Sequence, residues 1–313
     1  MQPILSAGKR WMYEISNPQR SACACNESRC PAKADTGPQH TAFRSPAPKG
    51  SPRLGPHKGK SLRHEPLGKD TPSFGDQCSL YPKTHHPWEK LAAIPETYFT
   101  AWGSLFQGLK LHPDDTLLIR GATCALGHAA IQIAKALGCK VIATTHREDK
   151  LRLLSQADLA LLDTGSLENI FSGEIAGAVQ TGRTSQIYGA TKTDGTAIPR
   201  PSKALELVGP KTLADTLRCV GKGGLVCTTG ILGGVYAINV FDPIKYIPNG
   251  VYLTGFYSNS PSQDTMDEIF CFMNAKRLTP PVGKVFDFSD IRKACTAQDN
   301  GSIDGKIIIR VSD

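Results

Sequence analysis

The sequence becomes regularly patterned at Trp88, where apolar residues begin to recur every three or four positions. These residues are Leu91, Ile94, Tyr98, Trp102, Leu105 and Leu109. Such spacing predicts a helix with one apolar face. Pro95 falls inside the pattern, and proline is tolerated in the first turn of a helix but not in its interior. The segment therefore predicts either two helices joined near Ile94 or one helix that begins around Pro95.

From 114 to 163, short apolar runs alternate with helical patterns. The runs at 117–119 and 141–143 predict buried strands, and the pattern at 129–137 predicts a helix that Gly138 ends. A further helix and a further strand follow. Strands that alternate with helices at this spacing form a parallel, doubly wound sheet. We therefore predict an α/β protein with a Rossmann-type fold.

The alternation stops at 172–202, a polar, glycine-rich stretch that is longer than an ordinary connection. It resumes with ALELVG, TLADTLRCVGKGGLVCTTGILGG and NGVYLTGFYS, which complete a sheet of about six strands. Residues 259–313 add the helix MDEIFCFMNAKRL, the strand GKVFDF, the short helix SDIRKACTAQ and the strand GKIIIRV. These elements make a poor core by themselves. We expect them to pack on the sheet domain or on a domain supplied elsewhere.

Residues 1–87 differ from the rest in composition. They contain 12 of the 22 prolines and 13 Lys and Arg against 6 Asp and Glu, a net of +7 out of +8 for the chain. A basic, proline-rich segment with few apolar residues is typical of a disordered tail. Nucleic-acid binding is the alternative, but the tail lacks interleaved aromatic residues and any known module. The predicted order is thus this tail, a helical connector (88–113), the sheet domain (114–258) and the C-terminal segment (259–313).

The ten cysteines do not form a convincing metal site. Cys23, Cys25 and Cys30 are spaced C-x-C-x4-C without a second pair, which does not favour zinc. Six others lie singly in apolar or helical segments, as reduced cysteines do: Cys124, Cys139, Cys219, Cys227, Cys271 and Cys295. Neither a secretory signal nor an apolar run of membrane-spanning length is recognisable. We therefore expect a cytoplasmic protein that does not enter a membrane.

The turn after the first strand carries the candidate chemistry. It consists of Gly121, Ala122, Thr123, Cys124, Ala125, Leu126 and Gly127. A glycine after the strand permits a tight turn, small residues let a phosphate approach the backbone, and the free N–H groups of the following helix attract a pyrophosphate. The alternative is an ordinary strand-to-helix turn, because the usual three-glycine pattern is incomplete.

The end of the second strand favours NADPH over NADH. An acidic residue there would bind the ribose hydroxyls of NAD, but this strand ends in hydroxyl and basic residues, with a lysine one turn later. These residues suit a 2′-phosphate. They are Thr144, Thr145, His146, Arg147 and Lys150. The alternative for Arg147 and Lys150 is a solvated helix face, and Glu148 and Asp149 fit the first turn of that helix.

Several stretches together resemble the medium-chain dehydrogenase/reductase superfamily, in its zinc-free, quinone oxidoreductase-like branch. They are PWEKLAAIPETYFTAWGSLF, TLLIRGATCALGHAAIQIAKALGCKVIATT, ALELVG, LRCVGKGGLVCTTGILGG, NGVYLTGFYS and GKIIIRV. They follow the family's order and cover residues 88–313 apart from the interruption. The resemblance implies an alcohol dehydrogenase-like NAD(P)-binding domain and hydride transfer from NADPH to a small quinone, enone or carbonyl compound.

The resemblance also implies roles for loops farther along the chain. In this family the residues expected to line the nicotinamide are Val208, Gly209, Thr229, Gly230, Ile231 and Leu232, for which simple turns are the alternative. The strand at 251–256 resembles an edge strand that commonly pairs across a dimer axis, so a homodimer is expected.

One departure from the family limits the functional prediction. The family's N-terminal catalytic barrel, a GroES-like domain, is not recognisable here, and residues 259–313 resemble only its C-terminal remnant. No catalytic residue can therefore be named, and the family's zinc-ligand patterns are absent. Two hypotheses remain: an NADPH-dependent reductase, or a non-catalytic NADPH-binding or interaction protein.

Overall fold

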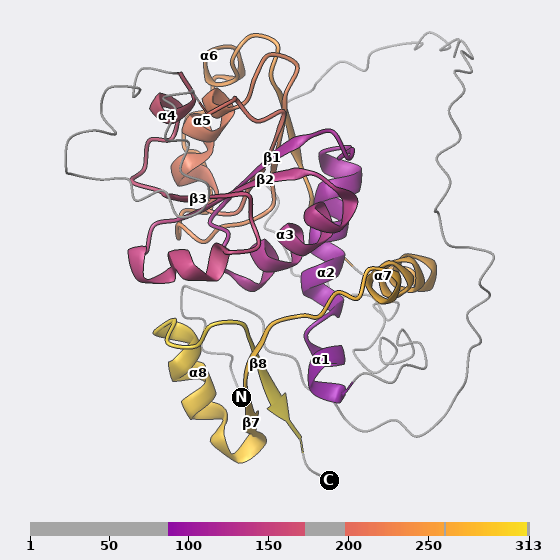
Figure 1. Cartoon of the computed structure of the whole chain (residues 1–313). Helices are drawn as coiled ribbons and strands as arrows, with labels where there is room; N and C mark the ends of the chain where they lie inside the picture. The colour runs from indigo at the N-terminus through magenta and orange to yellow at the C-terminus, as the bar shows by residue number, and fades with distance from the viewer. Residues whose placement is uncertain (1–86, 173–197, 260, 312–313) are drawn as a thin grey trace, which may run out of the picture.

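The computed structural model describes residues 87–172, 198–259 and 261–311. The predicted tail at 1–87, except for Pro87, and most of the interruption at 172–202 lie outside the described residues. Figure 1 shows the described chain as a sheet domain with a small lobe of α8, β7 and β8 beneath it.

Six parallel strands form the main sheet, in the order β3-β2-β1-β4-β5-β6. The predicted number of strands and the doubly wound fold are confirmed. Leu118 of β1 faces Ile142 of β2 on one side and Ala204 of β4 on the other. The strands are β1 (Thr116–Arg120), β2 (Lys140–Thr145), β3 (Leu159–Leu162), β4 (Lys203–Glu206), β5 (Leu225–Thr228) and β6 (Tyr252–Gly255).

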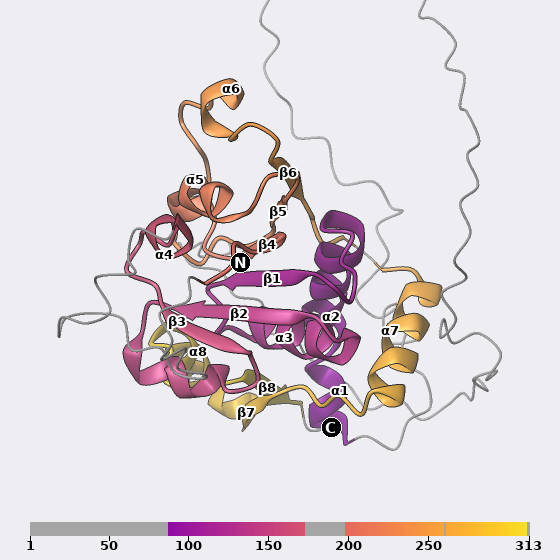
Figure 2. The same ribbon diagram turned by 45° about the horizontal axis from the view of Figure 1, so that its top comes forward.

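Helices cover both faces of the sheet, because successive residues of a buried strand point to opposite sides. Leu117 and Ile119 belong to the larger apolar core, with α2 (Pro95–Trp102), α3 (Ala125–Leu137), the 3-10 helix η4 (Glu148–Leu154) and α7 (Gln263–Ala275). Leu118 belongs to the second core, with α4 (Glu168–Ser172) and α5 (Pro210–Cys219). Figure 2 shows β1, β2 and β3 side by side within these layers.

The helical connector begins with two separate helices, which confirms the first of the two alternatives. Helix α1 (Trp88–Ala92) ends before Ile94, and α2 begins with Pro95 in its first turn. A π-helix, η3 (Gly103–Gly108), then continues the run. A Cβ atom at Gly103 would lie 2.0 Å from the ring of Phe256, so this glycine lets the connector pack directly on the end of β6.

The C-terminal residues form a small lobe. It contains β7 (Val282–Asp287), the 3-10 turn η6 (Phe288–Asp290), α8 (Ile291–Asp299) and β8 (Lys306–Arg310), and the two strands pair in parallel. Ile308 packs on Ala92 and Ala93, and the Lys306 ammonium lies 3.0 Å from the Thr97 hydroxyl. The lobe therefore packs on the helical connector of the sheet domain, as expected for elements with so little core of their own.

The cores give a direct stability prediction. Ile119 is fully buried in β1, whereas Ile244 in the short helix α6 (Pro243–Tyr246) is 89 % exposed. We expect Ile119→Ala to lower the free energy of unfolding by about 2–5 kcal/mol. Ile244→Ala, the same chemical change at the surface, should alter it by about 0.5 kcal/mol or less. Urea unfolding of the two variants measures this difference, and equal losses would contradict the burial assigned to β1.

Candidate functional site

The turn after β1 is held against the end of β2. Gly121 has a φ of +80°, a conformation that glycine adopts without strain. The amide of Ala122 donates to the carbonyl oxygen of Thr144 at 2.8 Å, and the amide of Gly121 lies 3.3 Å from the Thr144 hydroxyl. The turn therefore keeps a fixed position at the carboxyl end of two neighbouring strands.

The start of α3 packs unusually close to this turn. Cys124 caps the helix, and its Sγ accepts the amide of Gly127 at 3.3 Å. A Cβ atom at Gly127 would lie 2.3 Å from the carbonyl oxygen of Ala122. Gly127 therefore lets α3 pack closely on the turn, which brings the first turn of the helix to the carboxyl edge of the sheet.

Two further loops reach the same place. Gly209 after β4 has a φ of +93°, and a Cβ atom there would lie 2.6 Å from the carbonyl oxygen of Gly230 after β5. A Cβ atom at Gly121 would lie 3.1 Å from Val208 and 3.3 Å from Leu232. The structure thus brings together the turn at 121–127 and the loops at 208–209 and 229–232.

The residues at the end of β2 differ in their exposure to solvent. Thr144 and Thr145 are buried, and the Thr145 hydroxyl lies 3.4 Å from that of Thr123 in the first turn. His146 is exposed. Arg147 forms a surface ion pair with Asp149 at 2.7 Å, and this arginine lowers the pKa of the Asp149 carboxyl.

Lys150 lies one turn farther on and points at the C-terminal lobe. Its ammonium donates to the carbonyl oxygen of Gly301 at 3.1 Å and lies 3.1 Å from the carboxylate of Asp304. Lys150 is therefore not part of a solvated helix face. It joins the end of β2 to the loop between α8 and β8.

A buried arginine beneath these loops was missed by the sequence reasoning. Arg120, the last residue of β1, is fully buried. Its guanidinium donates to both oxygens of Asp163, at 2.7 and 2.9 Å, and to Asp215 at 2.6 Å. It also donates to the Thr216 hydroxyl at 2.9 Å. The neighbouring carboxylates account for the raised pKa of Arg120, although burial opposes it.

Glu206, the last residue of β4, belongs to the same buried cluster. One carboxylate oxygen accepts the amides of Val208 at 2.7 Å and Gly209 at 3.0 Å, and the other accepts the Thr216 hydroxyl. Burial raises the pKa of the Glu206 carboxyl. A sequence signal for this cluster existed: Arg120, Asp163 and Glu206 each end or follow a buried strand, and such ends meet at one edge of a parallel sheet.

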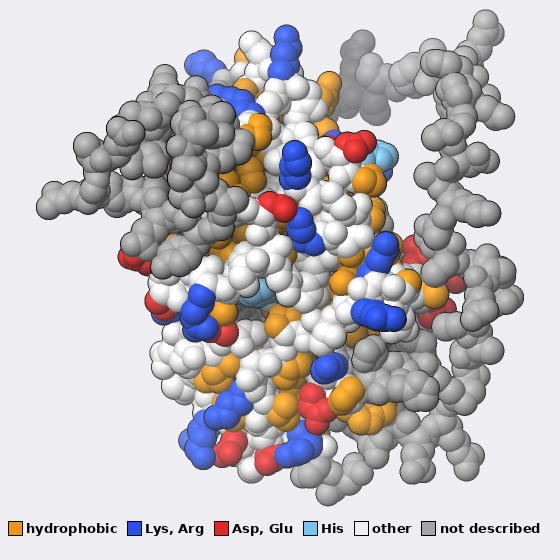
Figure 3. Space-filling model, in the orientation of Figure 1, with side chains coloured by type: hydrophobic (Ala, Val, Ile, Leu, Met, Phe, Trp, Pro, Cys, Tyr) orange, Lys and Arg blue, Asp and Glu red, His pale blue; other side chains and the backbone are white. Residues whose placement is uncertain are grey.

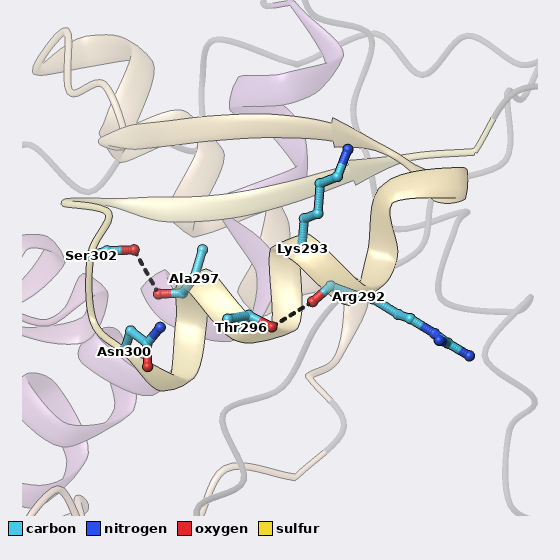
Figure 4. A pocket seen from close by; sticks show the side chains of 6 residues that line it. All are labelled: Arg292, Lys293, Thr296, Ala297, Asn300 and Ser302. Carbon is cyan, nitrogen blue, oxygen red and sulfur yellow. Dashed lines mark hydrogen bonds between the residues drawn. The ribbon is translucent and has the colours of Figure 1, made fainter.

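A hollow of about 400 Å³ on the C-terminal lobe lies along α8, shown in Figure 4, and contains none of the predicted site residues. The hollow is lined by Arg292, Lys293, Thr296, Ala297, Asn300 and Ser302. Figure 3 shows acidic and basic side chains interspersed over the visible face of the described residues.

Within 87–172, 198–259 and 261–311, there is no group of three or more His, Cys, Asp or Glu residues that could hold a metal ion. Among the same residues, no helix has both the length and the apolar character needed to span a bilayer. Cys23, Cys25 and Cys30 lie outside the described residues.

Comparison with known proteins agrees with this arrangement. Residues 125–274 match the family model of zinc-binding dehydrogenases. A zinc-type alcohol dehydrogenase-like protein of Schizosaccharomyces pombe is 26 % identical over 237 residues, which are 72 % of this chain and 60 % of that protein. A highly reducing polyketide synthase of Purpureocillium lilacinum is 45 % identical over 67 residues, or 21 % of this chain and 3 % of the synthase.

Solved structures share the fold. An NAD-dependent alcohol dehydrogenase superposes with a TM-score of 0.57 and 24 % identity, covering 74 % of this chain and 62 % of its own. The quinone oxidoreductase of Thermus thermophilus, solved also with NADPH, gives a TM-score of 0.55 and 23 % identity, covering 74 % and 69 %. Together with the family-model match, these likenesses support a C-terminal NAD(P)-binding domain of the medium-chain dehydrogenase/reductase type. The chain spans about 60 % of the length of the S. pombe relative.

The geometry of the first turn yields a prediction for Gly127. A methyl group there meets the rigid backbone of Ala122, so we expect Gly127→Ala to lower the free energy of unfolding by about 1–3 kcal/mol. Gly221 is the control, because the nearest atom to a Cβ there lies 3.9 Å away, and Gly221→Ala should change stability by less than about 1 kcal/mol. Chemical denaturation compares the variants. Equal stabilities would mean that α3 does not pack on the turn as described.

Proposed function

We propose that this protein is an NADPH-dependent oxidoreductase that transfers a hydride to a small quinone, enone or carbonyl compound. The observation that carries the proposal is the convergence of three loops, at 121–127, 208–209 and 229–232, on one edge of the sheet. In doubly wound sheets this edge, where the strand order reverses between β1 and β4, is where dinucleotides bind.

We assign the pyrophosphate to the start of α3. The first amides of a helix have no acceptor within the helix, and its dipole favours an anion at this end. Gly121 and Ala122 offer little side-chain bulk there, and Gly127 keeps the helix close to the turn. Thr123, Cys124, Ala125 and Leu126 complete the proposed phosphate-binding turn.

We assign the nicotinamide to the loops after β4 and β5. Val208 and Leu232 lie next to Gly121, so a nucleotide on the turn would extend over them. Bound there, the nicotinamide would supply the hydride. The chain's own part is to hold the ring with Val208, Gly209, Thr229, Gly230, Ile231 and Leu232. The amide of Leu232 donates to the carbonyl oxygen of Leu207 at 3.0 Å, which keeps the two loops in register.

The preference for NADPH rests on the end of β2. No carboxylate stands at Thr144, Thr145 or His146, where an acidic residue would select the ribose hydroxyls of NADH. Arg147 can exchange its exposed partner Asp149 for a 2′-phosphate at little cost, because surface ion pairs contribute about 0–1 kcal/mol. Lys150 would add its positive charge from beside Asp304.

The second candidate is an NADPH-binding protein without catalytic activity. It is favoured by the small size of the C-terminal lobe, which in the described residues consists of the two-stranded sheet β7-β8 with η6 and α8. Binding and turnover must therefore be tested separately.

The first test is a titration of the full chain with NADPH and with NADH, followed by nicotinamide fluorescence. We expect Arg147→Ala to weaken NADPH binding about tenfold and to change NADH binding less than about twofold, since only NADPH carries the 2′-phosphate. Arg152→Ala, which also removes one exposed arginine, is the matched control and should change neither affinity.

Addition of a simple quinone then separates the two candidates. Oxidation of NADPH that depends on the quinone supports the reductase. Tight binding without oxidation supports the non-catalytic protein, and failure to bind either nucleotide rejects both.

We further propose a homodimer that pairs the edge strand β6, within 251–256, across a twofold axis. Strand β6 ends the sheet, and Tyr252 on it is 59 % exposed. We expect Tyr252→Lys to shift the protein towards monomers, because a charge on an edge strand opposes pairing. Tyr236→Lys is the control, since Tyr236 is equally exposed but lies in the loop after β5. Sedimentation velocity reports the mass, and a wild-type monomer would reject the dimer.

A further inference from the structure

The buried cluster at the carboxyl edge of the sheet contains more negative than positive charge. One guanidinium, from Arg120, faces three carboxylates, from Asp163, Glu206 and Asp215. Arg120 and Glu206 are fully buried, and the side chains of Asp163 and Asp215 are 8 % and 17 % exposed. Buried ions are costly to desolvate, and apolar residues of similar size often stabilise a core at least as well. A contribution to stability is therefore a weak explanation for the presence of this cluster.

The carboxylates differ in the backbone segments that they hold. Asp163 accepts the amide of Gly165 at 2.9 Å, and Asp215 accepts the amide of Leu167 at 2.9 Å, so both fix the segment that follows β3. Glu206 instead accepts the amides of Val208 and Gly209. It is the member of the cluster whose side chain holds a loop assigned to the nicotinamide.

The main chain of Glu206 holds the other nicotinamide loop. Its carbonyl oxygen accepts the amides of Thr229 at 3.2 Å and Gly230 at 3.3 Å. One residue thus sets the positions of both loops, through its carboxylate on one side and its carbonyl oxygen on the other.

Thr216 connects Glu206 to its counter-ion. The Thr216 hydroxyl accepts from the Arg120 guanidinium at 2.9 Å and donates to the second carboxylate oxygen of Glu206. With the two amides on the first oxygen, the carboxylate has a hydrogen bond on each side and cannot rotate without breaking at least one. We propose that Glu206, held by Arg120 through Thr216, is the positioning residue for the two loops that line the nicotinamide.

This inference rests on the proposed function, and it makes a selective prediction. Adenosine 2′,5′-bisphosphate carries the 2′-phosphate of NADPH but no nicotinamide. A change at Glu206 should therefore weaken binding of NADPH and leave binding of this fragment intact. A general loss of structure would weaken both.

The test uses substitutions on the full chain. We expect Thr216→Val to weaken NADPH binding about tenfold and fragment binding less than about twofold, because it removes the hydroxyl link to Glu206. Thr212→Val is the matched control: Thr212 lies one turn earlier on α5, is also buried, and its hydroxyl has no hydrogen-bond partner among the described residues. It should change neither affinity.

Two variants at position 206 complete the design. Glu206→Gln retains an oxygen for the amides of Val208 and Gly209 and should bind NADPH better than Glu206→Ala, which removes that oxygen. Because Glu206→Ala could fail to fold, Thr216→Val and Glu206→Gln decide the outcome.

Selective loss of NADPH binding supports the inference. Equal loss of NADPH and fragment, or no loss of either in Thr216→Val, overturns it while the proposed function stands. A wild-type protein that binds neither ligand overturns the proposed function and the inference together.

Discussion

The parallel direction of all six strands is the constraint on which the site depends. Their carboxyl ends lie at one edge, so residues far apart in the sequence are delivered to the same place. The turn after β1 and the loops after β4 and β5 meet there, with Gly121 next to Val208 and Leu232. Glycine stands at 121, 127, 209 and 230, where the backbone of one segment lies against a neighbouring segment. The loops therefore come near enough to share one ligand. Bulkier residues would separate them.

The same constraint concentrates charge beneath the loops. Arg120 and Glu206 end neighbouring strands, and β1 pairs directly with β4, so their side chains share one buried space. A buried arginine without partners would be strongly destabilising, and a buried glutamate likewise. Together with Asp163, Asp215 and Thr216 they form a satisfied network, whose outer hydrogen bonds go to backbone amides of the loops. The hydrogen bonds that stabilise the buried charges therefore also hold the loops in fixed positions.

The sequence predicts the local part of this structure well. Strand β1, helix α3 and its end at Gly138 follow from apolar periodicity and from glycine's left-handed conformation, which need only neighbouring residues. The glycine turn was also predicted, because its pattern is contiguous. The partners of Arg120 were not, since Asp163 and Asp215 are 43 and 95 positions away. The contact of Lys150 with Gly301 spans 151 positions. Periodicity carries no information about such pairs, and only the assembled sheet brings them together.

The C-terminal lobe connects to the same edge of the domain. A two-stranded sheet is marginal by itself, so β7 and β8 depend on the packing of Ile308 against Ala92 and Ala93. Asp304, just before β8, pairs with Lys150 beyond the end of β2.

The lysine proposed to favour the 2′-phosphate is therefore also a link between lobe and domain. A phosphate that drew Lys150 away from Asp304 would loosen this link, whereas one bound by Arg147 would leave it intact. Asp149, the present partner of Arg147, is exposed, whereas the Lys150 side chain is 15 % exposed and also donates to the carbonyl oxygen of Gly301, so the exchange at Arg147 costs less. This difference favours Arg147 over Lys150 as the direct phosphate ligand.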